Sequence, residues 1–384
     1  MQQISSAAFA DTKQHYELLD GLRGVAALLV IWYHVFEGYA FAGKGMIETF
    51  NHGYLAVDFF FMLSGFVIAY AYDDRLRKNM TVSHFFKRRL IRLHPMVVMG
   101  ALIGAITFCL QGCVKWNGDT VTFDQVLMAL LFGILLLPAV PGMSREVRGN
   151  GEMFPLNGPS WSLFFEYIGN LLYVLFIQRL SNKQLTVFVV VTGILLCGYA
   201  LGDAASYGSI GVGWTFDTVN VVGGMLRMLF PFSLGMLLSR RFRPIVIKGA
   251  FWWCSILLIA LFAIPYIPGT EPICFNGIYE MFCIMIAFPI LVRLGASGHT
   301  TDAQSTRICK FLGDISYPVY IVHYPIMYLF YAWLIEKQLY TLNETWPVAI
   351  AVFIGNIVLA YLCLKLYDAP IRKRLAQRLT GQHR

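Results

Sequence analysis

Long, uninterrupted apolar stretches constrain this chain more than any other feature. Ten such segments recur along its 384 residues, and most are long enough to cross the roughly 30 Å hydrocarbon core of a bilayer as a helix. Because 57% of the residues are apolar and only 14% are charged, a soluble protein of this size is excluded. Closed β-barrels lack such continuous runs. The sequence therefore predicts an all-α, polytopic membrane helical bundle with about ten transmembrane helices. The predicted spans are 24–42, 54–72, 93–110, 160–178, 185–202, 219–238, 250–267, 273–292, 314–334 and 346–367.

Basic residues in the loops orient these spans. The segments DDRLRKNMTVSHFFKRRLIR, SRRFRPIVIK and IRKRLAQRLTGQHR are rich in Arg and Lys, whereas LGDAASYGSIGVGWTFD and YIPGTEPICF contain neither. By the positive-inside rule the three basic segments face the cytoplasm. The apolar stretch 126–140 is short, and a span there would put two basic regions on opposite sides. We therefore expect a re-entrant or interfacial segment near 126–140, with both termini cytoplasmic.

The N-terminal segment, the cysteines and the net charge exclude several classes of protein. The first seventeen residues lack a signal-peptide pattern, so we expect the N-terminus to be retained. The eight cysteines form no CxxC pair and no metal-ligand spacing, so neither a disulfide framework nor a metal site is indicated. Cys109 and Cys113 lie about one turn apart, for which packing is the favoured interpretation. Membrane topology explains the net charge of +8 better than nucleic-acid binding does. We expect one integral-membrane domain, residues 1–384.

Ionisable residues inside the predicted spans are candidates for a functional site, because they are costly in a bilayer. Each of them could instead form a hydrogen bond that holds two helices together. A functional site is therefore favoured only if several of these residues lie close to one another. From the helical rise, His34 lies roughly 16 Å, Glu166 roughly 20 Å and His323 roughly 14 Å above the inner boundary. We therefore expect one layer of polar groups around a partly hydrated cavity. The set comprises His34, Asp58, Glu166, Arg227, Glu280 and His323.

The spacing between Arg23 and His34 has a geometric meaning. Eleven residues make just over three helical turns, so the two side chains share a helix face about 16 Å apart. An extended ligand could touch both. Asp20 is expected to cap the helix, and Gly21 and Gly24 to let a bulky group approach the backbone.

The Arg-x10-His pair in LDGLRGVAALLVIWYH resembles the hallmark of the acyltransferase family 3 membrane proteins. Four later segments resemble that family's further motifs in the same order: FFFMLSGFVIAY, FFKRRLIRLHP, PSWSLFFEYIGNLLY and LGDISYPVYIVHYPI. The tail YDAPIRK resembles the closing Glu-x-Pro segment, with Asp368 in place of Glu. Glu166 stands alone where the family commonly has two acids. The resemblance covers about residues 16–374.

The resemblance implies a membrane acyltransferase. Such an enzyme moves an acetyl or other short acyl group from cytosolic acyl-CoA, a co-substrate rather than a tightly bound cofactor, to a hydroxyl of a carbohydrate or glycolipid. We therefore expect O-acetylation of cell-surface or exported polysaccharide by a multi-pass protein of the plasma (inner) membrane. We expect no additional C-terminal esterase-like domain in this protein. A second transfer would then need a separate periplasmic protein.

The chemistry of acyl transfer suggests roles for individual residues. A hydroxyl attacks a thioester slowly unless a base removes its proton, and imidazole suits that task near neutral pH. We assign it to His34, with Glu166 or Asp58 orienting the ring. Arginines bind phosphates well, although topology control explains such a cluster equally. The candidates for the CoA phosphates are Arg23, Arg88, Arg89 and Arg92.

The sequence leaves two roles open for each of three further residues. His323 lies in an aromatic, proline-broken stretch suited to stacking on a sugar or pantetheine arm, or to helix packing. Trp161 and Ser162 follow Pro159 and fit a helix start first and acceptor contacts second. The alternative function is a multipass transporter or flippase with a proton-relay site, which should show two symmetric halves with interrupted spans. No such symmetry is visible in the sequence.

Overall fold

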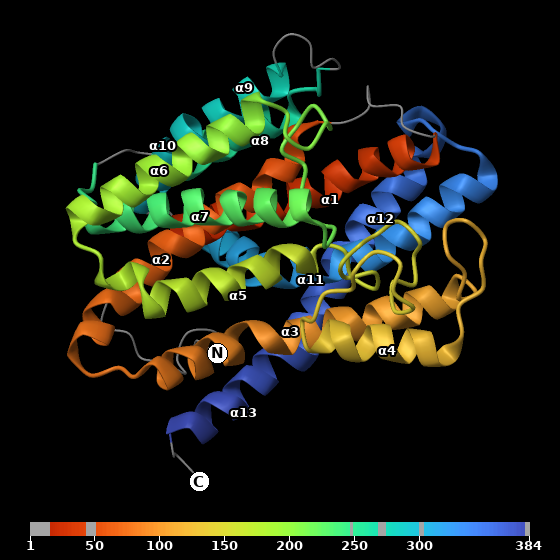
Figure 1. The fold of residues 1–384 in the computed structure, drawn as a ribbon, viewed down its shortest axis with the longest axis horizontal. Coiled ribbons are helices and arrows are strands. Elements are labelled where there is room, and N and C mark those ends of the chain that lie inside the picture. Colours follow the sequence, from red (N-terminus) through yellow and green to blue (C-terminus); the bar gives the residue numbers. More distant parts are fainter. Residues whose placement is uncertain (1–15, 44–50, 246–248, 268–273, 299–302, 381–384) are drawn as a thin grey trace.

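The computed structural model describes residues 16–43, 51–245, 249–267, 274–298 and 303–380. Over these ranges the chain is helical, with three isolated β-bridges and no strand (Figure 1). The all-α membrane bundle is confirmed. The helices are α1 Glu17–Ala42, α2 Ala56–Lys78, α3 Val82–Leu110, α4 Phe123–Ile134, α5 Ser160–Leu175, α6 Asn182–Leu201, α7 Thr218–Arg240, α8 Ala250–Ala263, α9 Phe275–Phe282, α10 Phe288–Ser297, α11 Ala303–Lys337, α12 Leu342–Cys363 and α13 Ala369–Thr380.

Every predicted span coincides with a helix. Nine helical segments in the described ranges are long and apolar enough to cross a membrane. The π-helical turns Cys283–Ala287 and Leu364–Asp368 join α9 to α10 and α12 to α13 into continuous segments. Only α8, with 14 residues, is shorter than the span expected at 250–267. The sequence pattern therefore predicted the positions of the helices correctly and overestimated the length of α8.

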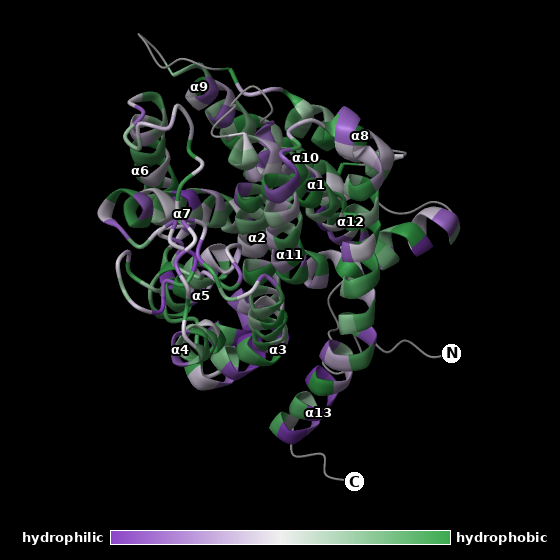
Figure 2. Ribbon diagram, turned by 90° about the vertical axis from the view of Figure 1, so that its right-hand side faces the viewer, coloured by the Kyte–Doolittle hydropathy of each residue, from purple (hydrophilic) through white to green (hydrophobic). Residues whose placement is uncertain are grey.

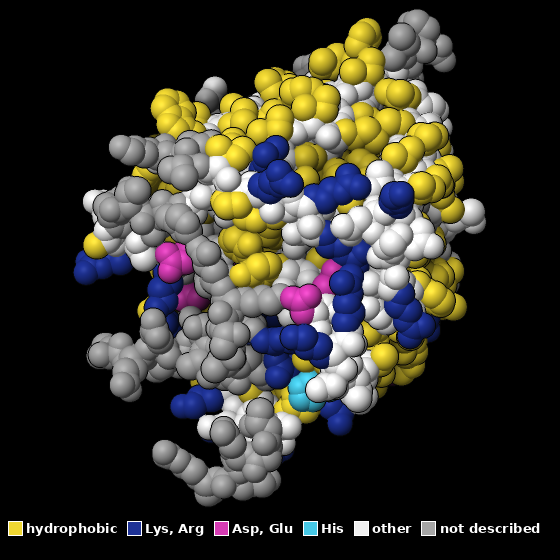
Figure 3. Space-filling model, turned by 90° about the vertical axis from the view of Figure 1, so that its left-hand side faces the viewer, with side chains coloured by type: hydrophobic (Ala, Val, Ile, Leu, Met, Phe, Trp, Pro, Cys, Tyr) yellow, Lys and Arg dark blue, Asp and Glu magenta, His cyan; other side chains and the backbone are white. Residues whose placement is uncertain are grey.

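The basic residues gather at one end of the bundle. The last turn of α2 carries Arg75, Arg77 and Lys78, and α7 ends with Arg240. Figure 3 looks at this end and shows many Lys and Arg side chains. We call it the basic end and the other the opposite end. The helix α13 continues α12 beyond the basic end and leaves the bundle, with polar and apolar residues interleaved along it (Figure 2).

The polypeptide between α3 and α5 enters the bundle without crossing it. As expected for 126–140, α4 is a short helix, and it lies along α3 (Figure 1). The following chain is irregular, and its last part, 152–159, is buried. There Asn157 Nδ2 donates to Ile321 O of α11 at 3.0 Å. Irregular backbone at such depth is tolerated because protein surrounds it. Consequently α5 begins in the interior, beside the middle of α11.

Two pairs of helices form the centre. In the first, α1 runs parallel to α11, and a β-carbon on Gly24 would lie 2.4 Å from Leu312 O. In the second, a β-carbon on Gly65 of α2 would lie 1.9 Å from Phe232 O of α7. Small residues permit such close packing in membrane proteins. The expectation that Gly21 and Gly24 leave room for a ligand is corrected, because Cys309 and Leu312 of α11 occupy that space.

Candidate active site

The middle of α1 holds a histidine and a carboxylate in direct contact. His34 Nδ1 lies 2.6 Å from Glu37 Oε2, one helical turn further along. Tyr331 and Tyr324 of α11 donate their hydroxyls to the same oxygen, at 2.8 and 3.2 Å. The Tyr331 hydroxyl also lies 2.8 Å from His34 O, so the two acceptors share its single hydrogen. Three donors on one oxygen fix the carboxylate, and the carboxylate in turn fixes the imidazole.

This contact assigns the proton on His34. The Glu37 carboxylate can only accept, so the hydrogen lies on His34 Nδ1, and in the neutral imidazole Nε2 then holds the lone pair. The side chains of His34 and Glu37 are 14% and 24% exposed, so the pair is reachable from outside the protein core. An oriented imidazole with a free, accessible nitrogen is what a general base requires.

A second histidine stacks on the first. The rings of His34 and His323 have centroids 5.1 Å apart and nearly parallel planes. His323 Nδ1 lies 3.1 Å from Val319 O and 3.0 Å from Tyr320 O, so it donates to its own helix. Its Nε2 is buried and has no hydrogen-bond partner. The structure thus brings together two imidazoles that the sequence predicted at one depth, each with an unused acceptor nitrogen.

Asp58 has a different partner from the one expected. Its oxygens accept from Arg227 Nε at 3.1 Å and Nη2 at 2.6 Å, and both side chains are at most 2% exposed. Arg227 also donates to Val212 O and Tyr54 O. The expected role of Asp58 in orienting His34 is therefore corrected, because the buried guanidinium occupies both oxygens.

Glu280 completes this network. It accepts from the Tyr54 hydroxyl and from Ile210 N at 3.0 Å. The network joins α2, α7, α9 and the segment before α7. Of the two interpretations offered for such residues, a functional site or hydrogen bonds that hold helices together, these residues fit the second. We call Asp58, Arg227, Tyr54 and Glu280 the aspartate cluster.

Glu166 also lies away from His34. It accepts from Arg89 Nη2 at 2.6 Å and from Ser64 Oγ at 2.9 Å. The depth predicted for Glu166 assumed that α5 starts at the membrane boundary. In fact α5 starts beside the middle of α11, so six residues of helix carry Glu166 about 9 Å toward the basic end. Its predicted contact with His34 is corrected for that reason.

Three of the four predicted arginines gather around Glu166. Arg23 is within electrostatic range of Arg89, Arg92 and Glu166. Arg89 is buried, and its Nε has no partner. These three arginines form a cationic cluster near the basic end, which we call the cationic mouth. Arg89 and Arg92 lie on α3, whereas Arg23 lies on α1, the helix that carries His34 about 16 Å deeper.

Two expectations at this mouth are corrected. Arg88 donates from Nε to His84 Nε2 at 2.9 Å and lies in electrostatic range of Arg75, so it interacts with the start of α3 and the last turn of α2. Asp20 does not cap α1, which begins at Glu17. Its carboxylate pairs with Arg23 at 3.0 Å instead.

Trp161 and Ser162 serve the start of α5. Ser162 Oγ donates to Pro159 O at 3.0 Å and lies 2.6 Å from the Tyr320 hydroxyl. Trp161 has the Arg227 guanidinium 5.2 Å from its ring centre. The helix-start interpretation is confirmed, and both side chains have partners within the protein.

Sequence reasoning missed Glu37 and a buried pair outside the spans. Glu37 was detectable, since it is an ionisable residue in a span, three positions after His34. Glu152 accepts from the Tyr328 hydroxyl, and Arg148 lies 3.6 Å over the Tyr328 ring. Burial raises the pKa of Glu152 to about 7, although the Tyr328 hydrogen bond and the positive charge of Arg148 oppose the shift. Neither residue carries a periodic signal, because both lie in irregular chain.

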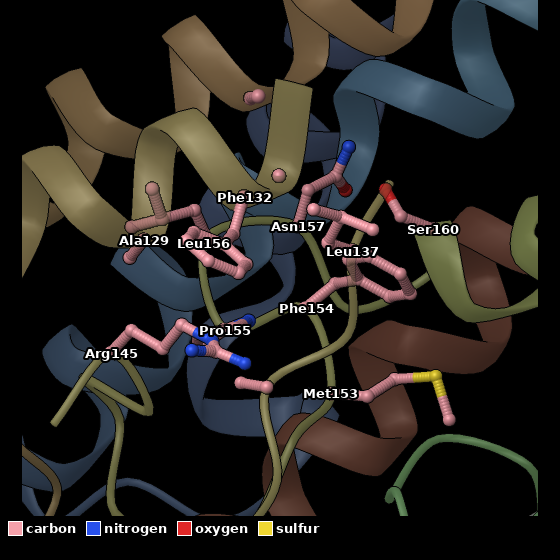
Figure 4. A pocket seen from close by; sticks show the side chains of 13 residues that line it. Ala129, Phe132, Leu137, Arg145, Met153, Phe154, Pro155, Leu156, Asn157 and Ser160 are labelled. Atoms are coloured by element: carbon pink, nitrogen blue, oxygen red, sulfur yellow. The ribbon is translucent and has the colours of Figure 1, made fainter. Parts of the chain in front are cut away.

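A small cavity lies between α3, α4 and the irregular segment (Figure 4). Its lining is largely apolar, with the polar side chains of Arg145, Asn157 and Ser160. None of the histidine or mouth residues lines it. This cavity is separate from the candidate site.

Comparison with known proteins agrees with the geometry. A family model described as an acyltransferase domain matches residues 16–365. The chain belongs to this acyltransferase family. Protein 2 in the picA locus of Rhizobium radiobacter is 36% identical over 190 residues, which cover 48% of this chain and 93% of that protein. No solved structure matches.

Two further relatives carry informative names. Peptidoglycan O-acetyltransferase OatA of Listeria monocytogenes is 25% identical over 387 residues, covering 94% of this chain and 56% of its own length. Exopolysaccharide production protein ExoZ of Rhizobium meliloti is 24% identical over 290 residues, covering 71% of this chain and 76% of its own length. The chain thus spans little more than half of the peptidoglycan O-acetyltransferase.

Proposed function

We propose that this protein transfers an acetyl or other short acyl group from acyl-CoA to a hydroxyl of a polysaccharide or glycolipid. The hydrogen bond between His34 and Glu37 carries the proposal, because it leaves an oriented, accessible imidazole nitrogen in the middle of a membrane bundle. The names of two relatives, which refer to peptidoglycan and to exopolysaccharide, support a glycan acceptor.

In the proposed reaction His34 acts as the general base. The acceptor oxygen attacks the thioester carbonyl carbon while His34 Nε2 takes its proton. When the tetrahedral intermediate collapses, the carbon–sulfur bond breaks and the imidazolium returns the proton to the CoA thiolate. Glu37 stabilises the imidazolium, as the aspartate does in serine hydrolase triads.

We place the donor along α1. The basic end corresponds to the cytoplasm by the positive-inside rule, so acyl-CoA approaches from that side. Arg23, Arg89 and Arg92 supply planar guanidinium groups for its phosphates. The pantetheine arm then extends along α1 toward His34. By the same rule we propose that both termini face the cytoplasm and that the acceptor binds at the opposite end.

Turnover of labelled acetyl-CoA by the purified protein tests the proposal. We expect CoA release that depends on a glycan acceptor and is lost in His34→Ala. Arg23→Ala should raise the KM for acetyl-CoA about tenfold, the effect of losing roughly 1.4 kcal/mol of phosphate binding. Arg88→Ala is the matched control and should leave KM unchanged. Solute uptake by proteoliposomes without CoA release would favour a transporter and contradict the proposal.

A further inference from the structure

The face of α1 that carries His34 continues toward the opposite end of the bundle. Glu37 and Phe41 follow His34 at helical spacings of three and four residues, so the three side chains lie along one face. The helical rise puts Phe41 about 10 Å beyond His34. The side chains of His34 and Glu37 are partly exposed, and Phe41 is 39% exposed. This face therefore leads from the candidate base to the end of the bundle where we place the acceptor.

Aromatic side chains gather at the outer part of this face. The centroid of the Phe41 ring lies 5.1 Å from that of Trp116 and 5.7 Å from that of Tyr331. Trp116 lies 6.1 Å from Tyr328, and Tyr328 lies 4.7 Å from Tyr324. A contact of 6.2 Å between Tyr324 and Tyr331 closes the circuit. We call Phe41, Trp116, Tyr324, Tyr328 and Tyr331 the aromatic cluster.

Two rings of the aromatic cluster are open to a ligand. The three tyrosines are at most 9% exposed, and their hydroxyls donate to the carboxylates of Glu37 and Glu152. Phe41 is exposed, and Trp116 is half-buried. The tyrosines therefore form the base of the cluster, and Phe41 and Trp116 form its contact surface.

Arg148 fixes the position of Trp116 in the turn after α3. The backbone N of Trp116 donates to Arg148 O at 3.0 Å, and the Arg148 guanidinium lies 5.2 Å from the centre of the Trp116 ring. Arg148 is 1% exposed and donates to Pro155 O at 3.0 Å and to Gln111 Oε1 at 2.5 Å. A ring that is held in place before binding loses little conformational freedom when a ligand arrives.

Polar atoms around the aromatic cluster lack partners. Within the described residues, Trp116 Nε1, Arg148 Nη2 and Asn150 Oδ1 are buried and form no hydrogen bond. Asn150 lies beside the cluster, because its Nδ2 donates to Glu152 Oε1 at 2.9 Å. A buried indole N–H usually has a partner, and each unpaired buried group needs an explanation. A ligand hydroxyl supplies such partners, directly or through a bound water.

An anchor at the membrane boundary would look different from Trp116. Tryptophans in that role point their N–H group at the lipid headgroups and lay the ring against the lipid. In Trp116 the N–H group is buried and the ring lies against Phe41 and Arg148. The surroundings of Trp116 therefore favour a binding role over anchoring.

We propose that Phe41 and Trp116 form a platform on which a sugar unit of the glycan acceptor stacks. The inference rests on the proposed function, in which an acceptor hydroxyl reaches His34. A sugar ring presents C–H groups on its faces and hydroxyls at its rim, which match an aromatic surface with unpaired polar atoms beside it. Because the platform lies about 10 Å beyond His34, it holds a neighbour of the sugar that is acylated. The site therefore selects an oligosaccharide over a single sugar.

Equilibrium dialysis of the purified full chain tests the platform. The probes are labelled tetrasaccharides of glucose and of N-acetylglucosamine, and the detergent has no sugar headgroup that would compete. We expect the wild type to bind at least one of them. Phe41→Ala and Trp116→Ala should each raise its Kd about 2- to 10-fold, the effect of losing an aromatic contact. The matched control is Trp253→Ala on α8, where the tryptophan is 68% exposed, and its Kd should equal that of the wild type.

Thermal unfolding of each variant separates lost binding from lost folding. Phe41 is exposed, so Phe41→Ala keeps the test valid if Trp116→Ala does not fold. An unchanged Kd in either folded variant would overturn the inference, as would a wild type that binds neither tetrasaccharide. Because binding needs no acyl-CoA, the two proposals fail separately. Acetyl transfer with unchanged Kd values would contradict the platform alone, and weakened binding without any acetyl transfer by the wild type would contradict the proposed function alone.

Discussion

Two of the ionic clusters in the described part of the bundle differ in how completely their polar groups are paired. In the aspartate cluster, Asp58 and Arg227 are at most 2% exposed and fully paired. In the histidine cluster, His34 and Glu37 are 14% and 24% exposed, and His323 Nε2 has no partner. Both contain ionisable residues of the kind that marks functional sites in membranes. Only the histidine cluster has free hydrogen-bonding capacity and access, so these properties separate a reactive site from a structural one.

Asp58→Asn should have the largest effect on stability. It leaves the Arg227 guanidinium buried without the carboxylate that pairs with it, which costs about 3–5 kcal/mol. Thermal unfolding in detergent should show a marked fall in Tm, together with poor expression. The double variant Asp58→Leu, Arg227→Met should regain much of the loss, because it removes both charges. If Asp58→Asn unfolded at the same temperature as the wild type, the aspartate cluster would not be needed for stability, and this difference between the two clusters would be lost.

Glu37→Gln should lower the rate of catalysis and leave stability unchanged, the opposite of what we expect for Asp58→Asn. The amide keeps the shape of the side chain but removes the negative charge that stabilises the His34 imidazolium. We expect kcat to fall by about 10- to 100-fold, with the KM for acetyl-CoA and the Tm near wild type. Steady-state kinetics and thermal unfolding measure the three quantities. An unchanged kcat would show that Glu37 serves packing alone.

Glu152 belongs to neither cluster and is buried outside the spans. Burial raises its pKa from 4.5 to about 7. The folded protein therefore binds this proton more tightly than the unfolded chain does. The free energy of unfolding should fall as the pH rises from about 4.5 to about 7, by on the order of 3 kcal/mol. Glu152→Gln should abolish this part of the pH dependence. The same slope in the variant and the wild type would contradict the assignment.

The sequence predicted His34 and His323 at one depth, in a layer that also included Glu166, because the two histidines could be placed on helices of the same direction. It also predicted the meeting of Arg23 with Arg89 and Arg92, since all three fall at one boundary. These predictions depend only on helical rise and loop charge. The parallel packing of α1 and α11 then brings His34 and His323 together.

Other parts of the site were beyond such reasoning. The pairing of Asp58 with Arg227 joins residues 169 positions apart, which no local pattern encodes. The position of Glu166 depends on the buried segment 152–159, and irregular chain has no periodicity that reveals burial. Glu37 differs from both, because its spacing from His34 was visible in the sequence.

The account rests most directly on the single-turnover rate of acyl transfer in His34→Ala. The enzyme is saturated with labelled acetyl-CoA and mixed with a glycan acceptor, and Tm is measured on the same sample. We expect Tm to remain within a few degrees of the wild type and the transfer rate to fall about 10²- to 10⁴-fold, the usual contribution of a general base. A folded variant that transfers the acyl group at the wild-type rate would contradict the assignment of His34 as the base.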